Sequence, residues 1–146
     1  MTGEALWLKF MEENHLQNCE YDTWCFGGDA DLLAALVVEG KKTATSSAYP
    51  LYAVDNEPLP QEGTYSVILN SRDGAVCVIR TTKVSIVPFD KITEAHAYRE
   101  GEGDRSLKFW KTVHEKFFSE AMKEANLEFS PDMKVVCEEF EVVFTP

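Results

Sequence analysis

The sequence has few cysteines, no long apolar stretch and little positive charge. Its four cysteines form none of the close pairs, about two to four residues apart, that a zinc site needs, and its three histidines do not complete a ligand set. No apolar run reaches the roughly 18 residues that span a bilayer, and the N-terminus lacks a basic segment followed by an apolar one. We therefore expect no metal, no cofactor, no membrane partner and a cytoplasmic protein with free thiols.

The charge balance excludes one class of ligand for the surface as a whole. Fourteen Lys and Arg residues stand against 25 Asp and Glu residues, so the net charge is -11. Such a surface repels a phosphate backbone, and a nucleic-acid or nucleotide ligand must meet a local group of basic residues. The 146 residues, 45% hydrophobic and 27% charged, are typical of a single globular domain.

Apolar spacing and capping residues predict four helical segments. Leu6 and Phe10 belong to a predicted helix over residues 3–17, an arm (residues 1–23) that packs on the domain of residues 24–146. A second helix starts at a cap, Asp29 or Asp31, and ends at Gly40. A short helical segment over 90–100 and the strongest helix, over 106–126, complete the set.

Four segments have the composition of strands. They cover residues 43–48, 64–69, 75–87 and 134–144, with a hairpin connection over 70–74. Because regular helices do not separate these strands, parallel winding is not expected. The sequence predicts an α+β domain, a small, mostly antiparallel barrel or curled sheet with flanking helices, in which the last strand closes the sheet.

The junction of residues 40–46 carries the first candidate chemistry. It holds a glycine, two lysines and three hydroxyl side chains in an acidic protein. In an extended chain, Thr43 and Thr45 lie on one side, and Lys42 and Ser46 lie on the other. The alternative interpretation is a solvated helix end, where lysines are favourable against the helix dipole.

The segment of residues 99–106 is the second candidate. It combines two glycines with acidic and basic side chains. The alternative is a flexible loop in which Asp104 or Ser106 caps the next helix. His114 lies on the apolar stripe of that helix and is predicted to be a core histidine, whereas His15 and His96 have no recognisable partner.

These residues together resemble the ASCH domain family of the PUA-like superfamily. Gly40-Lys41-Lys42-Thr43-Ala44-Thr45 is similar to the family's Gly-x-Lys-x-x-Thr motif. The stretch Glu100-Gly101-Glu102-Gly103-Asp104 resembles one bacterial branch with an EGEGD-type motif. The likeness covers residues 24–144, including the segments 57–65, 76–82 and 133–144.

The resemblance implies a PUA-like barrel with a cleft beside it, and RNA or a modified nucleoside as partner. Family members hydrolyse the amide of N4-acylated cytidines or act as ribonucleases. In the hydrolase branch a lysine, a threonine and a glutamate do the work. By motif position these are Lys42, Thr45 and Glu100, with Glu102 as an alternative glutamate. That branch has an arginine two residues after the threonine, where this chain has Ser47.

The chemistry of such a trio is coherent. A threonine hydroxyl needs a base, and a lysine close to another cation, such as Lys41 or Arg80, can act as one. A glutamate whose pKa is raised by burial could protonate the leaving amine. The same three side chains also suit binding without catalysis.

Four functions remain open from the sequence. The first is binding of RNA or a modified nucleoside, the second is the amidohydrolase, and the third is a metal-independent ribonuclease in which Lys42 stabilises phosphorane-like charge and Ser106 assists. The fourth is an interaction module whose patch is the aromatic segment 21–26. The predicted ligand-binding residues are Lys41, Thr43, Arg80, Arg99, Glu102, Arg105 and Ser106.

Overall fold

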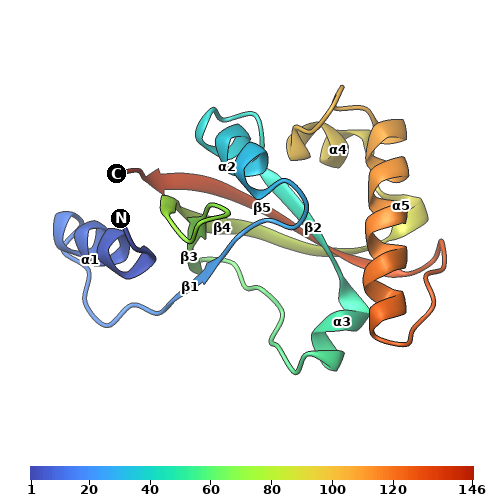
Figure 1. Cartoon of the computed structure of the whole chain (residues 1–146), viewed down its shortest axis with the longest axis horizontal. Helices are drawn as coiled ribbons and strands as arrows, with labels where there is room; N and C mark the ends of the chain where they lie inside the picture. The colour runs from blue at the N-terminus through green and yellow to red at the C-terminus, as the bar shows by residue number, and fades with distance from the viewer.

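A five-stranded sheet forms the centre of the molecule (Figure 1). The computed structural model describes all residues, 1–146. The strand order is β1-β3-β4-β5-β2, with β1 parallel to β3 and every other pair antiparallel. The strands are β1 (Tyr21–Trp24), β2 (Ala44–Ala48), β3 (Tyr65–Leu69), β4 (Ala75–Pro88) and β5 (Lys134–Phe144).

Five α-helices surround this sheet, with α1 at one end and α4 and α5 at the other (Figure 1). None of them has the length and apolar character needed to cross a membrane. The helices are α1 (Gly3–Glu13), α2 (Ala30–Val38), α3 (Tyr49–Val54), α4 (Glu94–Glu100) and α5 (Leu107–Glu124), and a 3₁₀ turn covers Phe89–Lys91.

The caps expected from the sequence are present. Asp29 accepts a hydrogen bond from Leu32 N–H at 3.1 Å and caps α2, and Gly40 follows that helix with a φ of +82°. Ser106 caps α5 through Phe109 N–H at 3.1 Å. These contacts satisfy N–H groups that have no partner inside the first helical turn.

Two expectations differ from the structure, and strand β1 and helix α3 were not predicted. The first helix ends at Glu13 rather than Gln17. Pro50 lies in the first turn of α3, where proline is tolerated. The sheet is mostly antiparallel, as expected, but it does not close into a barrel: β1 and β2 are free edges and β5 lies between β4 and β2, so the last strand does not close the sheet. The α+β class is confirmed.

Helix α1 covers one face of the sheet with aromatic side chains. Leu6, Trp7 and Phe10 are buried against Val67 and Val78. Because β1 pairs with β3 here, Tyr21 is drawn into the same cluster and stacks on Trp7 with the ring centres 4.4 Å apart. The predicted exposed patch over 21–26 is therefore wrong, since Phe26 is buried and the larger side chains of β1 are partly covered.

Helices α2 and α5 bury two further apolar clusters against the sheet. The α2 cluster joins Leu33 and Val37 to strands β3, β4 and β5, and the α5 cluster joins Trp110 and Phe118 to β5. The buried residues of α5 recur at 110, 114, 118 and 122, one side of a helix.

Two loops pack tightly where β2 begins. Thr43 N–H donates to the carbonyl oxygen of Arg99 at 2.7 Å. Gly101 has a φ of +73°, and a Cβ there would lie 2.3 Å from the carbonyl oxygen of Lys41. Only glycine fits this approach, so the two segments singled out in the sequence lie side by side.

Candidate functional site

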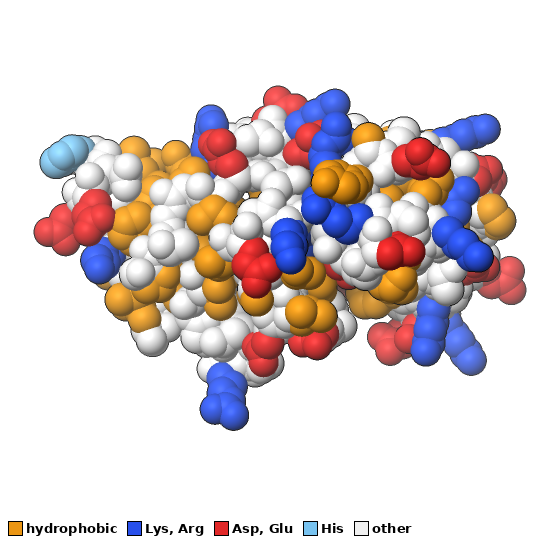
Figure 2. Space-filling model, turned by 90° about the horizontal axis from the view of Figure 1, so that it is seen from above, with side chains coloured by type: hydrophobic (Ala, Val, Ile, Leu, Met, Phe, Trp, Pro, Cys, Tyr) orange, Lys and Arg blue, Asp and Glu red, His pale blue; other side chains and the backbone are white.

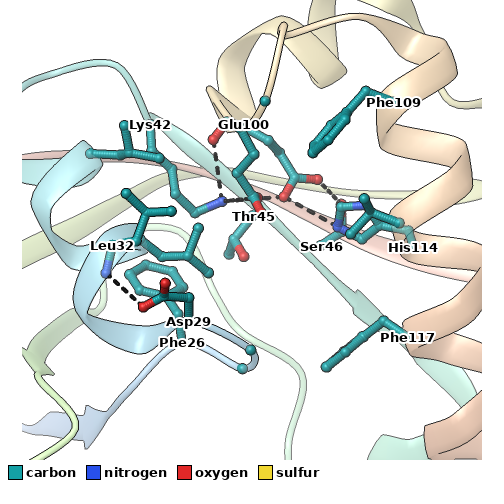
Figure 3. A pocket seen from close by; sticks show the side chains of 17 residues that line it. Phe26, Asp29, Leu32, Lys42, Thr45, Ser46, Glu100, Phe109, His114 and Phe117 are labelled. Carbon is teal, nitrogen blue, oxygen red and sulfur yellow. Dashed lines mark hydrogen bonds and ion pairs between the residues drawn. The ribbon is translucent and has the colours of Figure 1, made fainter.

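A cavity of about 260 Å³ lies where α2, β2, the loop after α4 and α5 meet (Figure 3). Its polar floor comes from Lys42, Thr45, Ser46, Glu100 and Glu102, with His114 on α5 beside them. Its apolar wall comes from α2, α5 and Phe26. The cavity therefore brings together the predicted trio of Lys42, Thr45 and Glu100, and both candidate glutamates.

Lys42 lies at the floor of the cavity and is only 1% exposed. Its ammonium group contacts Glu102 Oε2 at 3.0 Å, Glu100 Oε1 at 3.3 Å and the carbonyl oxygen of Glu100 at 3.4 Å. The three N–H groups of an ammonium thus meet three acceptors. The expected neighbours of this lysine were cations, Lys41 or Arg80; the structure gives it two carboxylates and a carbonyl oxygen instead.

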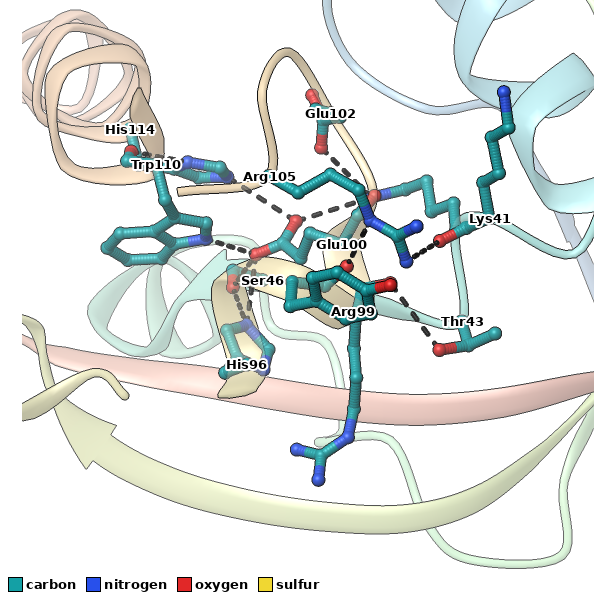
Figure 4. Close-up of polar contacts among 12 residues, drawn as sticks. Lys41, Thr43, Ser46, His96, Arg99, Glu100, Glu102, Arg105, Trp110 and His114 are labelled. Carbon is teal, nitrogen blue, oxygen red and sulfur yellow. Dashed lines mark hydrogen bonds and ion pairs between the residues drawn. The ribbon is translucent and has the colours of Figure 1, made fainter. Parts of the chain in front are cut away.

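Glu100 is the centre of a buried hydrogen-bond network (Figure 4). Its Oε2 lies 2.5 Å from Ser46 Oγ and 2.9 Å from His96 Nε2, and it also accepts from the indole N–H of Trp110. Its Oε1 contacts Lys42 and lies 3.5 Å from His114 Nε2. Five groups from four segments of the chain therefore converge on one carboxylate.

These partners set the protonation of Glu100. Burial raises the pKa of this carboxyl, but the hydrogen bonds from His114 and His96 and the charge of Lys42 hold the pKa well below its ordinary value. The carboxyl is therefore ionised at neutral pH. The sequence-based expectation of a glutamate acid with a raised pKa is wrong for Glu100 in this arrangement.

The sequence interpretation missed Ser46, His96 and Trp110 as members of the network. His96 does have partners: its Nε2 lies 2.7 Å from Ser46 Oγ as well as against Glu100. A signal existed, since His96 and Glu100 are four residues apart and helical spacing puts such a pair on one face. His114 is buried as predicted, and it also lines the cavity.

Thr45 reaches the cavity without joining the network. Its side chain is half-buried and lines the cavity, and its hydroxyl donates to no base. In the antiparallel ladder it stands opposite Glu138, whereas Ser46 stands opposite Cys137. Successive residues of a strand face opposite sides, so the two adjacent hydroxyls lie in different chemical surroundings.

The other predicted ligand-binding residues, Glu102 excepted, lie outside the cavity. Arg80 is exposed on β4 opposite Tyr65, and Ser106 serves as the α5 cap. Lys41 is exposed and pairs with Glu39 at 3.7 Å.

Three predicted residues join loops to each other at the rim. The Thr43 hydroxyl donates to the Arg99 carbonyl at 3.4 Å, and the Arg99 side chain pairs with Glu139 at 3.4 Å. Arg105 donates to the Lys41 carbonyl at 3.2 Å and lies over the Tyr98 ring, 3.6 Å from its centre. They hold the loops around the cavity in place (Figure 4).

Glu100, Glu102 and His114 are the one group with the chemistry of metal ligands. One potential ligand atom from each lies within 4.8 Å of the others. Lys42 already supplies a cation to both carboxylates. The two carboxylates of this group are therefore already paired with a cation of the same chain.

The chain is thus an α+β domain with an open five-stranded sheet, and its cavity at the start of β2 has a buried ion pair in its floor. The model of the ASCH domain matches residues 22–144, and the chain belongs to the ASCH domain family. A comparison with functionally curated proteins finds no match.

Solved structures agree with this assignment. The ASCH domain from Lactobacillus crispatus JV V101 is 30% identical, with a TM-score of 0.91 over 97% of this chain and 94% of that one. Protein EF3133 from Enterococcus faecalis V583 is 38% identical, with a TM-score of 0.90 over 97% of this chain and 88% of that one. The hypothetical protein PH0355, at 14% identity and a TM-score of 0.57, shares the fold alone, over 84% of this chain and 98% of that one.

Proposed function

We propose that the cavity binds a small uncharged modified nucleoside and hydrolyses its amide, with N4-acylated cytidine as the model substrate. The observation that carries the proposal is the charge of the lining. One lysine, Lys42, stands among three carboxylates, those of Asp29, Glu100 and Glu102. A phosphate group in this cavity would meet an excess of negative charge, whereas an uncharged nucleoside would not.

The apolar wall supports a ligand with a flat, weakly polar part. Phe109, Val113 and Phe117 recur every four residues along α5 and line the cavity. Phe109 and Phe117 lie across the cavity from Leu32 of α2 (Figure 3). Phe117 is 44% exposed and Leu32 is 54% exposed. Side chains of this kind on both sides of an opening favour stacking and packing of a nucleobase.

Two glycines make room for these rings. A Cβ at Gly103 would lie 2.5 Å from the ring of Phe109, and a Cβ at Gly27 would lie 2.9 Å from that of Phe117. The aromatic wall is thus placed by backbone positions that take no larger side chain. Pockets for small ligands combine such a wall with a few convergent polar groups, and the floor around Lys42 supplies them.

The chemistry requires an attacking oxygen and a fixed polar environment. The hydroxyls of Thr45 and Ser46 line the floor, and water can also enter. Lys42 and Glu100 are rigid because both are buried and multiply bonded. Preorganised charge of this kind stabilises the charge that develops in acyl transfer.

Binding of a short RNA segment is the second candidate. It is favoured by Arg105, whose side chain lies at the rim over the Tyr98 ring and donates to the Lys41 carbonyl. The side chains of Lys41 and Arg99 extend away from it in opposite directions, toward Glu39 and Glu139 (Figure 4). Over the face seen in Figure 2, however, basic side chains are interspersed with acidic ones. Phosphate contacts would make this binding fall steeply with salt.

The test is incubation of the purified protein with N4-acetylcytidine, followed by chromatography of the nucleosides. We expect cytidine and acetate from the wild type, and no product from Lys42→Met. Lys83→Met is the control, because Lys83 is an exposed lysine on β4 outside the cavity. The 5′-phosphate of the same nucleoside should react more slowly, since the carboxylates of the lining repel it.

Each other result has a definite meaning. Salt-independent binding of N4-acetylcytidine without turnover would leave a nucleoside-binding domain and remove the hydrolase. Salt-sensitive binding of single-stranded RNA, lost in Arg105→Ala, would favour the second candidate. Turnover by Lys42→Met at the wild-type rate would contradict the assignment of the cavity.

A further inference from the structure

We propose that Ser46, with His96 as its base, is the hydroxyl that attacks the acyl carbon in this cavity, in place of Thr45. This inference rests on the proposed amide hydrolysis and names the residue that carries it out. It goes against the motif-based assignment, in which the threonine attacks. The difference comes from what each hydroxyl touches.

Ser46 is the hydroxyl with a base in hydrogen-bond range. Its Oγ lies 2.7 Å from His96 Nε2 and 2.5 Å from Glu100 Oε2. The side chain is half-buried and also lines the cavity. It is therefore open to a ligand on one side and held by a base on the other, as a serine nucleophile requires.

Thr45 meets neither condition of activation. No base accepts a hydrogen bond from its hydroxyl, and the lysine assigned to it has its three N–H groups directed to Glu100 and Glu102. Recruiting Lys42 as a base would break these ion pairs inside the protein. That cost makes Lys42 a poor proton acceptor for its neighbour.

The step balances in atoms and protons. In the resting site the Ser46 hydroxyl and His96 Nε2–H both donate to Glu100 Oε2, so the step uses the other tautomer of His96, with its proton on Nδ1 and Nε2 free to accept. Ser46 Oγ then forms a bond to the acyl carbon while its proton moves to His96 Nε2. The C–N bond then breaks, and His96 returns that proton to the leaving amine of the nucleoside, which leaves an acyl ester on Ser46. Water repeats the sequence with the same base, releasing the carboxylic acid and restoring the serine.

Glu100 is placed to assist as a positioning residue. Its Oε2 lies 2.9 Å from His96 Nε2. In the tautomer that accepts the serine proton, this contact joins two acceptors, and once His96 has taken that proton it joins an N–H to a carboxylate. Glu100 therefore stabilises the imidazolium that forms during the attack. Trp110 and Lys42 keep the carboxylate in position.

The first experiment traps the acyl enzyme on the wild-type protein. The protein is mixed with N4-acetylcytidine, and separately with p-nitrophenyl acetate, an activated ester that reports a nucleophile independently of the amide. After acid quenching, peptide mass spectrometry locates the acetyl group. We expect it on Ser46; an acetyl group on Thr45 would overturn the inference.

The second experiment uses variants and steady-state kinetics. Ser46→Ala should lower kcat for N4-acetylcytidine by at least about 10³-fold, and His96→Gln by about 10²- to 10⁴-fold, with KM nearly unchanged in both. Thr45→Val should lower kcat much less than Ser46→Ala. Ser85→Ala is the matched control. Ser46 of β2 and Ser85 of β4 both stand opposite Cys137 of β5, on the two neighbouring strands, but Ser85 does not line the cavity.

The two proposals fail in different ways. If the wild type does not turn over N4-acetylcytidine, the proposed function is wrong, while acetylation of Ser46 by p-nitrophenyl acetate would still support the nucleophile. If the wild type turns over the nucleoside and Ser46→Ala does so equally well, the amidohydrolase stands and the nucleophile is wrong. Loss of activity with a raised KM alone would make Ser46 a binding residue and also overturn the inference.

Discussion

A buried glutamate, Glu100, and a half-buried one, Glu138, lie on opposite faces of the β2–β5 ladder, and their pKa values are shifted in opposite directions. Glu100 contacts Ser46 on one face, whereas Glu138 stands beside Thr45 on the other. Burial raises the pKa of Glu138 to about 6; a hydrogen bond from Thr81 at 3.5 Å lowers it only partly, and the charge of Asp22 raises it further. The pKa of Glu100 is held well below its usual value.

Burial raises the pKa of both carboxyls, and the number of donors determines whether the net shift is up or down. Glu138 accepts a hydrogen bond from one threonine hydroxyl. Glu100, in contrast, is contacted by five polar groups, those of Ser46, His96, Trp110, His114 and Lys42. The ionised carboxylate of Glu100 orders its neighbours in the cavity, whereas Glu138 does not line the cavity.

Removing the cation from the Glu100 side should have the largest effect on stability. Lys42→Met leaves the buried carboxylate of Glu100 and that of Glu102 without their cation, which costs about 3–5 kcal/mol of unfolding free energy. Urea unfolding at pH 7 measures it. Adding Glu100→Gln to this variant should restore part of the loss, and a double variant less stable than Lys42→Met would contradict the account.

Acid should destabilise the protein through the Glu100 side. Because its folded-state pKa is depressed, Glu100 contributes stability above its ordinary value of 4.5, and this contribution is lost as pH falls through the folded-state pKa. Unfolding free energies from pH 7 to pH 2 should decline in the wild type and decline less in Glu100→Gln. If the unfolding free energies of the two proteins fell equally with pH, the pKa of Glu100 would not be lowered in the folded protein.

The Glu138 side should respond in the opposite sense. A folded-state pKa raised from 4.5 to about 6 means that stability falls as pH rises between these values. Glu138→Gln should therefore be more stable than the wild type at pH 8, by about 1–2 kcal/mol, and equal to it at pH 4. Urea midpoints at the two pH values test this, and a destabilised variant at pH 8 would reverse the comparison.

An exposed ion pair should matter least. Lys83 lies 3.9 Å from Glu139, and its side chain is 64% exposed. Water screens such pairs, so Lys83→Met should change the unfolding free energy by less than about 1 kcal/mol. Thermal melts of Lys83→Met and Lys42→Met measure the difference. Equal decreases in melting temperature would mean that the burial of Lys42 has no energetic consequence.

Local chemistry explains which parts of the fold could be predicted. The α5 stripe, the Asp29 and Ser106 caps and the β3–β4 hairpin depend on neighbours within a few residues. Strand β1 and the open sheet could not be predicted in this way, because the parallel pairing of Tyr21 with Tyr65 joins segments far apart in the chain. Such pairing leaves no mark on local periodicity.

In the candidate site, likewise, the sequence indicated some residues but not the contacts between them. Spacing and family resemblance brought Lys42, Thr45 and Glu100 to notice, and the structure places all three in one cavity. The charge of Glu100 could not be read from the sequence, since its donors come from β2, α4 and α5. Neither could the partner of His96, a serine fifty positions earlier.

Helix α5 carries two parallel rows of side chains with different roles, which meet only at His114, a buried residue that also lines the cavity. One row, at 110, 114, 118 and 122, is in the core, and the adjacent row, at 109, 113 and 117, forms the cavity wall. A single inserted residue before Phe109 would turn everything after it by about 100°. Core and wall would then be lost together, so this helix should accept many substitutions over evolutionary time while its length between Ser106 and Met122 stays constant.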